Sequence, residues 1–314
     1  MLHAFRSDRL IGVVGLLLAV AIAAAAVPLR AQTAAEPACS QVEATYAAER
    51  DRLNARTLSF LLFDAAEEGC AALVDRLLTE GASIKARNRI GNTALILSSR
   101  MGHVEVVDLL LKRGAVIDQA NLNGVTPLLA AATRGREQAV QFLLATGADQ
   151  TLADNRGVTP LIAAAFEGHE SVARILIDSG ADTQRVDETG KGALVYAAGH
   201  GSTALVDLLL GTGIDVDRRY GNDLTALMWA AGHADEVAVA DGVATVELLL
   251  AKGARLDPVD NRGRSALMIA AGRGHAEIVK RLVAAGADAA WRDKEGKTAF
   301  DLAADDAVRT ALLQ

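Results

Sequence analysis

The sequence predicts an all-α protein in which short pairs of helices stack in a row as an α-solenoid. A five-residue signature, most often Gly-x-Thr-(Ala/Pro)-Leu, recurs every 33 residues, apart from one interval of 40. In most copies a second glycine follows eleven residues after the first, as Gly102 follows Gly91. Such a period is typical of stacked repeats, because a single helix pair cannot bury its apolar faces alone. The signatures begin at Gly91, Gly124, Gly157, Gly190, Asp223, Gly263 and Gly296.

Each repeat is expected to open with a tight turn and a short first helix. An Asn or Asp stands three residues before most signature glycines, where its side chain can accept hydrogen bonds from nearby backbone while the glycine adopts positive φ. Thr126 and Pro127 then supply an N-cap and a first helical residue whose missing N–H costs nothing. The Asn and Asp positions are Asn88, Asn121, Asp154, Asp187, Asp260 and Asp293.

A second helix is expected after the second glycine of each repeat. Apolar residues recur there at helical spacing, as in Val104, Val107, Leu110 and Leu111. The helix is expected to stop at a Gly-Ala pair such as 147–148, because glycine readily takes the left-handed conformation of a helix C-cap.

This pattern resembles the ankyrin repeat, most fully in residues 157–169 (GVTPLIAAAFEGH), and the resemblance covers residues 58–314. The family usually has a histidine directly after the signature leucine. Here that position holds Ile96, Leu129, Ile162, Val195, Met228 and Met268, so we expect more apolar packing between repeats. The resemblance implies about eight helix-turn-helix units joined by hairpin turns. They comprise residues 58–90, 91–123, 124–156, 157–189, 190–222, 223–262 with a seven-residue insertion, 263–295 and a terminal cap at 296–314.

The N-terminus has the features of an export signal. Residues 1–31 combine Arg6 and Arg9 with an apolar run from Leu10 to Val27, followed by small residues, and cleavage is expected between Ala31 and Ala35. An uncleaved anchor is the alternative, because 18 apolar residues can just span a bilayer. The protein is therefore expected in the periplasm of a bacterium, or anchored in the inner membrane and facing the periplasm.

Residues 32–57 are expected to form a linker and an N-terminal capping helix. Ser40 and Glu43 have the spacing of a capping box that opens a helix running to about Arg56. The chain has two cysteines, Cys39 and Cys70, and an oxidising compartment favours a disulfide between them. In the loop-entropy model such a bond contributes about 3–4 kcal/mol. Two unpaired thiols are the alternative.

Composition and motifs argue against several functions. The net charge is −7, and residues 1–31 contain three arginines and one aspartate, so the remainder carries −9. An acidic chain without a basic stripe argues against nucleic acid as a partner. We find no nucleophile, phosphate-loop or metal motif, and therefore expect no enzyme activity, no cofactor and no metal. His103, His169 and His275, in the Gly-His turns, are expected to cap the second helices.

One alternative is a protein that binds a metal or small ligand. His200 and His233 occupy the same place in consecutive repeats, and the insertion near residues 234–240 adds carboxylates around it. Stacked helices lie about 8–10 Å apart, so two imidazoles would need a third ligand from the inserted loop to hold one zinc ion. We expect this loop to lie on the binding face of its repeat.

The favoured function is binding of a protein partner by a monomeric scaffold or inhibitor. The resemblance implies that hairpin tips and first helices form a concave binding surface. Arginine with methionine and phenylalanine is enriched on this surface, as at protein interfaces. The residues assigned to it are Arg89, Asn92, Arg100, Met101, Val125, Arg134, Arg156, Phe166, Glu167, Lys191, His200, His233, Arg264 and Arg273.

Overall fold

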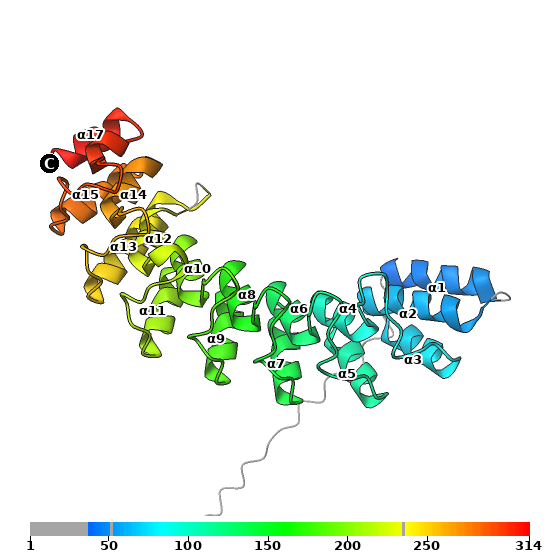
Figure 1. Ribbon diagram of the computed structural model, residues 1–314. Coiled ribbons are helices and arrows are strands. Elements are labelled where there is room, and N and C mark those ends of the chain that lie inside the picture. Colours follow the sequence, from blue (N-terminus) through cyan, green and yellow to red (C-terminus); the bar gives the residue numbers. More distant parts are fainter. Residues whose placement is uncertain (1–36, 51–52, 234–235) are drawn as a thin grey trace, which may run out of the picture. The chain divides into compact units, whose positions relative to one another are not determined.

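The computed structural model describes residues 37–50, 53–233 and 236–314 (Figure 1). The regular elements among these residues are helices, and one isolated bridge joins Val186 to Gly192. This confirms the predicted all-α architecture. The predicted export signal lies outside the described residues.

Helices alternate between two rows, because each repeat contributes one helix to each row (Figure 1). The first row comprises α2 (Ala55–Glu67), α4 (Ala94–Met101), α6 (Pro127–Thr133), α8 (Pro160–Phe166), α10 (Ala193–Gly199), α12 (Ala226–Ala231), α14 (Ala266–Arg273) and α16 (Ala299–Leu302). The second row comprises α3 (Ala71–Thr79), α5 (Val104–Lys112), α7 (Glu137–Ala145), α9 (Glu170–Asp178), α11 (Thr203–Gly211), α13 (Val239–Ala251), α15 (Ala276–Ala284) and α17 (Asp306–Leu312). Each helix packs on its partner and on the next helix of its own row.

The start of the stack differs from the prediction. A helix α1 (Pro37–Glu49) precedes the repeats, but it begins before Ser40, so Ser40 and Glu43 do not form a capping box. A separate helix, α2, begins at Ala55 because the side chain of Asn54 accepts hydrogen bonds from the backbone of Arg56 and Thr57. The first repeat therefore starts a few residues before position 58, and α1 packs against α2 as a cap.

The helix boundaries inside the repeats follow the predicted chemistry. Thr126 Oγ1 accepts a hydrogen bond from the backbone N–H of Leu129 at 3.2 Å, and Pro127 is the first helical residue. At the other end of each pair, Gly147 has φ +93° and no atom stands near the place of its missing side chain. Backbone conformation, rather than crowding, therefore requires glycine at this position.

Hairpin turns join the repeats and form a continuous series of contacts. In the first such turn, Asn88 Oδ1 accepts hydrogen bonds from the backbone of Ile90 and Asn92, which confirms the predicted role of the Asn and Asp positions. The tip of each hairpin also donates one backbone hydrogen bond to the preceding tip. The N–H groups of Leu122, Asn155, Glu188, Gly221, Asn261 and Lys294 donate to the carbonyls of Ile90, Asn123, Arg156, Gly190, Asn222 and Arg262, respectively.

The apolar core lies between the two rows. The apolar residues that replace the family's histidine are all buried. Val195, Met228 and Met268 belong to this core, whereas Ile96, Leu129 and Ile162 line a groove along the first row. Leu95, Leu128 and Leu161 of the signatures are buried beside them. The core is therefore continuous from repeat to repeat, which is the condition under which a stack of short helix pairs is stable.

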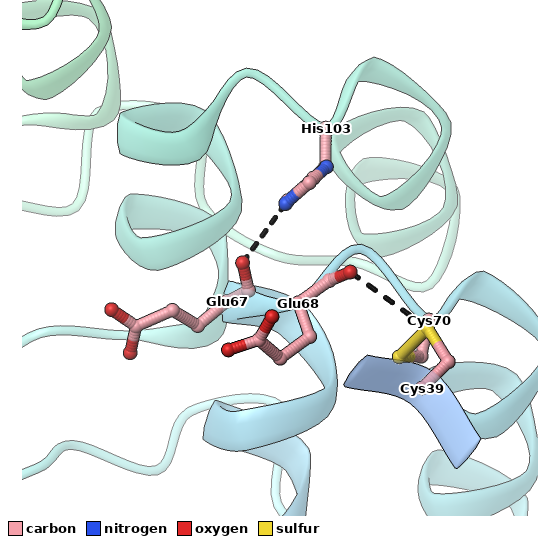
Figure 2. The surroundings of a disulfide bond; sticks show 5 residues. All are labelled: Cys39, Glu67, Glu68, Cys70 and His103. Atoms are coloured by element: carbon pink, nitrogen blue, oxygen red, sulfur yellow. Dashed lines mark hydrogen bonds between the residues drawn. A yellow bond between two sulfur atoms is a disulfide. The ribbon is translucent and has the colours of Figure 1, made fainter. Parts of the chain in front are cut away.

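A second set of contacts bridges neighbouring repeats, and it corrects the role predicted for the Gly-His histidines. The ring of His103 makes no cap on α5; its Nε2 instead lies 2.9 Å from the carbonyl oxygen of Glu67 in the preceding repeat (Figure 2). Arg136 Nε and His169 Nε2 reach the carbonyls of Arg100 and Thr133, also 36 residues earlier, at 3.2 Å each. These side chains therefore connect repeats.

At the start of the stack, the Cys39–Cys70 disulfide occupies the position of the repeat that His103 has in the next repeat. Cys70 immediately precedes α3, as His103 precedes α5, and its sulfur bonds to Cys39 of α1 (Figure 2). Val42 and Tyr46 of α1 are buried, and Tyr46 donates a hydrogen bond of 2.6 Å to the Glu80 carboxylate. The covalent bond thus attaches the capping helix where a histidine or arginine attaches later repeats.

The sixth repeat departs from the others at both its turn and its insertion. Tyr220 is buried where other turns have Asn or Asp, and Asn222 and Asp223 adopt positive φ. The insertion was predicted as a loop, but Val239 begins α13, which has 13 residues where α5, α7, α9, α11 and α15 have nine. Val239 and Ala240, at the end of the insertion, therefore belong to a lengthened helix, while residues 234–235 lie outside the described residues.

Ser99 provides a test of the packing between repeats. Its side chain is fully buried in α4, where other repeats have alanine, and its hydroxyl has no hydrogen-bond partner among the residues that the structure describes. Because an unsatisfied buried hydroxyl is costly, Ser99→Ala should raise the free energy of unfolding by about 1–2 kcal/mol. The measurement is the urea midpoint followed by circular dichroism.

The neighbouring Ser98 is the matched control. It is equally buried, but its hydroxyl donates to the carbonyl of Leu95 at 3.2 Å. Ser98→Ala should therefore give no comparable gain. Equal midpoints for Ser99→Ala and the parent chain would show that the Ser99 hydroxyl costs nothing.

Candidate partner-binding groove

A groove of about 480 Å³ runs along the first-row helices α4, α6, α8 and α10 and the hairpin turns beside them. Its floor is apolar and includes Ile96, Leu129 and Ile162, one from each of three successive repeats. Arg100, at the end of α4, contributes a polar group to the rim. The repeats thus place one apolar floor position after another at a constant period of 33 residues.

The groove contains about half of the residues that the sequence assigned to the binding surface. Those that line it are Asn92, Arg100, Val125, Arg134, Arg156, Phe166 and Glu167. Those that do not are Arg89, Met101, Lys191, His200, His233, Arg264 and Arg273. Arg89, Met101 and Arg273 are exposed outside the groove, whereas Arg264 forms an ion pair with buried Asp260 at 2.7 Å. Whether any of the fourteen contacts a partner stays a prediction.

Two of the assigned residues are buried, contrary to the expectation that they face a partner. Asn92 is 3% exposed, and its side-chain oxygen accepts a hydrogen bond of 2.7 Å from Asn121 Nδ2, which connects two hairpins. His233 is also 3% exposed, and its ring stacks on that of His275 with centroids 3.9 Å apart. The added turn of α13 explains this burial, because Gly242 lies directly against the His233 ring.

His200 and His233 therefore have different surroundings. His200 is exposed, and its ring Nδ1 lies 2.9 Å from the carbonyl oxygen of Tyr196. Its ring is perpendicular to that of Phe166, with centroids 5.8 Å apart. Within the described residues there is no group of three His, Cys, Asp or Glu side chains that could hold a metal ion. Asp235, which the alternative metal site also used, lies outside those residues.

The arginines that line the groove differ in whether they already form an ion pair. Arg100 forms an ion pair of 2.7 Å with Glu67, and Arg156 forms one of 3.0 Å with Asp154. Arg134, at the end of α6, is exposed, and its side chain makes no hydrogen bond or ion pair with another described residue. Arg134 therefore offers a guanidinium whose hydrogen-bond donors are open to a ligand.

A hydrogen-bonded group lines the groove where it meets α10. Asp187 accepts hydrogen bonds from the Thr189 hydroxyl at 2.7 Å and the Tyr196 hydroxyl at 2.5 Å. Burial alone would raise the pKa of Asp187, but these bonds and those from the backbone of Thr189 and Lys191 hold it below its usual value. Burial, together with the hydrogen bond to Asp187, raises the pKa of Tyr196 to about 12.

Aromatic rings continue from the groove over the next two repeats. Phe166 packs edge-on against Tyr196 with ring centroids 5.2 Å apart. The Lys191 ammonium lies 5.7 Å from the Tyr196 centroid and 5.1 Å from that of Trp229, within the range of a cation–π contact. Sequence reasoning missed Tyr196, although a signal existed: it stands where the two preceding repeats have Ala163 and Ala130.

These features define the class of the protein, an α-solenoid of stacked turn-helix-helix units with a groove along its first-row helices. The chain belongs to the ankyrin-repeat family: the model for ankyrin repeats (3 copies) matches residues 62–154, 114–187, 147–220 and 236–313. Ankyrin repeats indicate a scaffold for interactions between proteins, so the partners are expected to be proteins.

One curated relative is the mouse (Mus musculus) ankyrin repeat and SAM domain-containing protein 6, which is 48% identical over 66 residues. The match spans 21% of this chain and 8% of the mouse protein. No helix among the described residues is long and apolar enough to cross a membrane, and the apolar run of residues 10–27 lies outside them.

The bond between Tyr196 and Asp187 predicts a pH-dependent effect of Tyr196→Phe. At pH 7 the substitution should lower the free energy of unfolding by about 1–3 kcal/mol, because a buried carboxylate loses a donor. Tyr196 has a raised pKa in the folded state, so its contribution is complete below pH 10 and is lost as the pH rises toward 12. Urea midpoints of parent and variant should therefore converge above pH 10.

Unfolding at acid pH gives a second test of the hydrogen bond between Tyr196 and Asp187. The folded-state pKa of Asp187 is lowered, so its contribution is complete above about pH 4 and is lost as the pH falls below that value. Tyr196→Phe should shift acid unfolding to higher pH. If the urea midpoints of parent and variant differed by the same amount from pH 3 to pH 11.5, this interpretation would be wrong.

Proposed function

We propose that this protein is an exported, non-catalytic and monomeric scaffold that binds a segment of a partner protein in the groove along α4 to α10. The proposal rests on one observation. The groove combines an apolar floor with exposed side chains of the types that contribute most to binding at protein interfaces. Phe166 is 49% exposed, the Arg134 side chain makes no hydrogen bond or ion pair with another described residue, and both side chains line the groove. Aromatic residues and arginine are enriched among the residues that contribute most to binding.

The aromatic side chains of the groove are also held in place by other residues of the chain, which supports a role in binding. Phe166 is held edge-on by Tyr196, and Tyr196 is fixed through Asp187 to a hairpin turn. A ring that is already oriented loses little conformational freedom when a partner binds. The family's use as interaction scaffolds agrees with this, and no reacting group is needed for the function.

Partner capture tests the groove. We expect Phe166→Ala to reduce recovery of a cross-linked partner from a cell-envelope extract at least tenfold, since truncation of an aromatic anchor typically costs about 2 kcal/mol or more. Phe60→Ala is the matched control, because Phe60 is 50% exposed on α2 and does not line the groove. Equal recovery with both variants would argue against the groove as the binding surface.

The proposal of export rests on residues 1–31 and on the cysteines. A basic start followed by an apolar run and small residues is the pattern of a secretory signal. Structural disulfides persist in oxidising compartments, and the Cys39–Cys70 bond suits the periplasm. Retention of the apolar segment as an inner-membrane anchor is the alternative for the same residues.

N-terminal sequencing and thiol labelling of protein from the cell envelope test the proposed export. The mature chain is expected to begin between Gln32 and Glu36, in soluble periplasm, with Cys39 and Cys70 reacting with iodoacetamide only after reduction. A chain that begins at Met1 and sediments with membranes would favour the anchor. Two thiols that react without reductant would contradict an oxidising compartment.

A further inference from the structure

The capping helix α1 has few buried side chains to hold it on the first repeat. Among residues 39–49, Val42 is 9% exposed and Tyr46 is 6% exposed, whereas most of the others are exposed. The hydroxyl of Tyr46 donates to Glu80 at 2.6 Å, and the guanidinium carbon of Arg76 lies 5.7 Å from the centroid of its ring. The noncovalent contacts of α1 therefore depend mainly on two side chains.

A helix of this length needs more support than two side chains give. α1 has 13 residues, and isolated helices shorter than about 12–15 residues are marginal in water. Fixing the backbone of every residue costs conformational entropy, which a small buried surface offsets only in part. The Cys39–Cys70 bond joins residues 31 apart in sequence and keeps α1 beside the first repeat. Retention of α1 is therefore expected to depend on the covalent bond.

The repeats have other contacts that do not involve α1. The backbone N–H of Cys70 donates to the carbonyl of Ala65 at 2.8 Å, so the turn before α3 has its own hydrogen bond. His103 Nε2 lies 2.9 Å from the carbonyl oxygen of Glu67 (Figure 2), and Arg100 pairs with the Glu67 carboxylate. The first and second repeats are thus joined independently of α1. Loss of the disulfide should free α1 and leave the repeats assembled.

The two cysteines differ in exposure, and this difference decides where a reductant can react. Cys39 is partly exposed on α1, whereas Cys70 is 6% exposed at the start of α3. In thiol–disulfide exchange a thiolate must reach one sulfur of the bond, and the other sulfur leaves. Cys39 is therefore the sulfur open to attack, and Cys70 is the leaving group.

We infer that the Cys39–Cys70 bond is a redox-sensitive switch, and that its reduction by a dithiol releases α1 and uncovers the face of the first repeat beneath Val42 and Tyr46. A thiolate of the dithiol bonds to Cys39 Sγ, and the disulfide breaks as Cys70 leaves and takes up a proton. The second thiol of the reductant then attacks its partner sulfur in this mixed disulfide, and Cys39 leaves and is protonated. The protein gains two electrons and two thiols, and the dithiol becomes a disulfide.

Trapping of the mixed disulfide tests the site of attack. The folded, oxidised chain is incubated briefly with glutathione, a monothiol, and free thiols are then alkylated with iodoacetamide. We expect peptide mapping by mass spectrometry to find at least about tenfold more glutathione on Cys39 than on Cys70, because access limits the exchange. The matched control is the same chain in urea, where this preference should disappear. Equal or greater labelling of Cys70 in the folded chain would overturn the inferred direction of attack.

Hydrogen exchange followed by mass spectrometry tests the release of α1. After reduction with dithiothreitol, we expect the amides of residues 37–49 to exchange at least about tenfold faster, while the helices from α4 to α15 keep their protection. A double variant, Cys39→Ala with Cys70→Ala, should give the same pattern without reductant. Tyr46→Phe is the matched control, because it removes the hydrogen bond to Glu80 but keeps the disulfide, and it should leave α1 protected.

Two results of the exchange experiment would show that the inference is wrong. Unchanged protection of residues 37–49 after reduction would mean that Val42 and Tyr46 hold α1 without the bond. Loss of protection throughout the repeats would mean that the disulfide supports the whole stack rather than its cap. Neither result bears on capture of a partner by the groove, because no residue of α1 lines it.

Discussion

Contact between neighbouring repeats is the constraint on which the rest of the structure depends. A repeat of two short helices has no core of its own, so each unit is stable only against the next. Three kinds of contact recur along the stack: apolar packing along each row, a backbone hydrogen bond between hairpin tips, and a side chain that reaches a carbonyl of the preceding repeat. His103, Arg136 and His169 provide the last of these from one position of the repeat.

The fold was predictable because the same local sequence pattern recurs from repeat to repeat. The Asn and Asp turns, the Thr N-caps and the Gly C-caps act locally, within a few residues, so their chemistry can be recognised without coordinates. Errors arose where residues act across repeats. His103 was expected to cap its own helix, but its ring contacts Glu67 of the preceding repeat, and sequence spacing does not reveal that direction.

The candidate groove was predictable in position but not in detail. The rows of exposed positions follow from the repeat period, and this explains why Arg100, Arg134, Arg156 and Phe166 meet in one groove. Burial was harder to predict. His233 is covered because the insertion adds a turn to α13, and sequence reasoning treated that insertion as a loop. Tyr196 was missed because its function depends on a bond to Asp187 that only the folded turn creates.

The two ends of the array are closed by different means. At the N-terminal end a disulfide ties α1 to the first repeat, whereas the C-terminal end relies on α17 and on α16, a four-residue helix with a Thr298–Asp301 capping box. Because a covalent bond holds α1 against the first repeat, α1 cannot detach from that repeat while the bond is intact. The groove begins at α4, in the next repeat, so an intact bond keeps the units beside the groove in register.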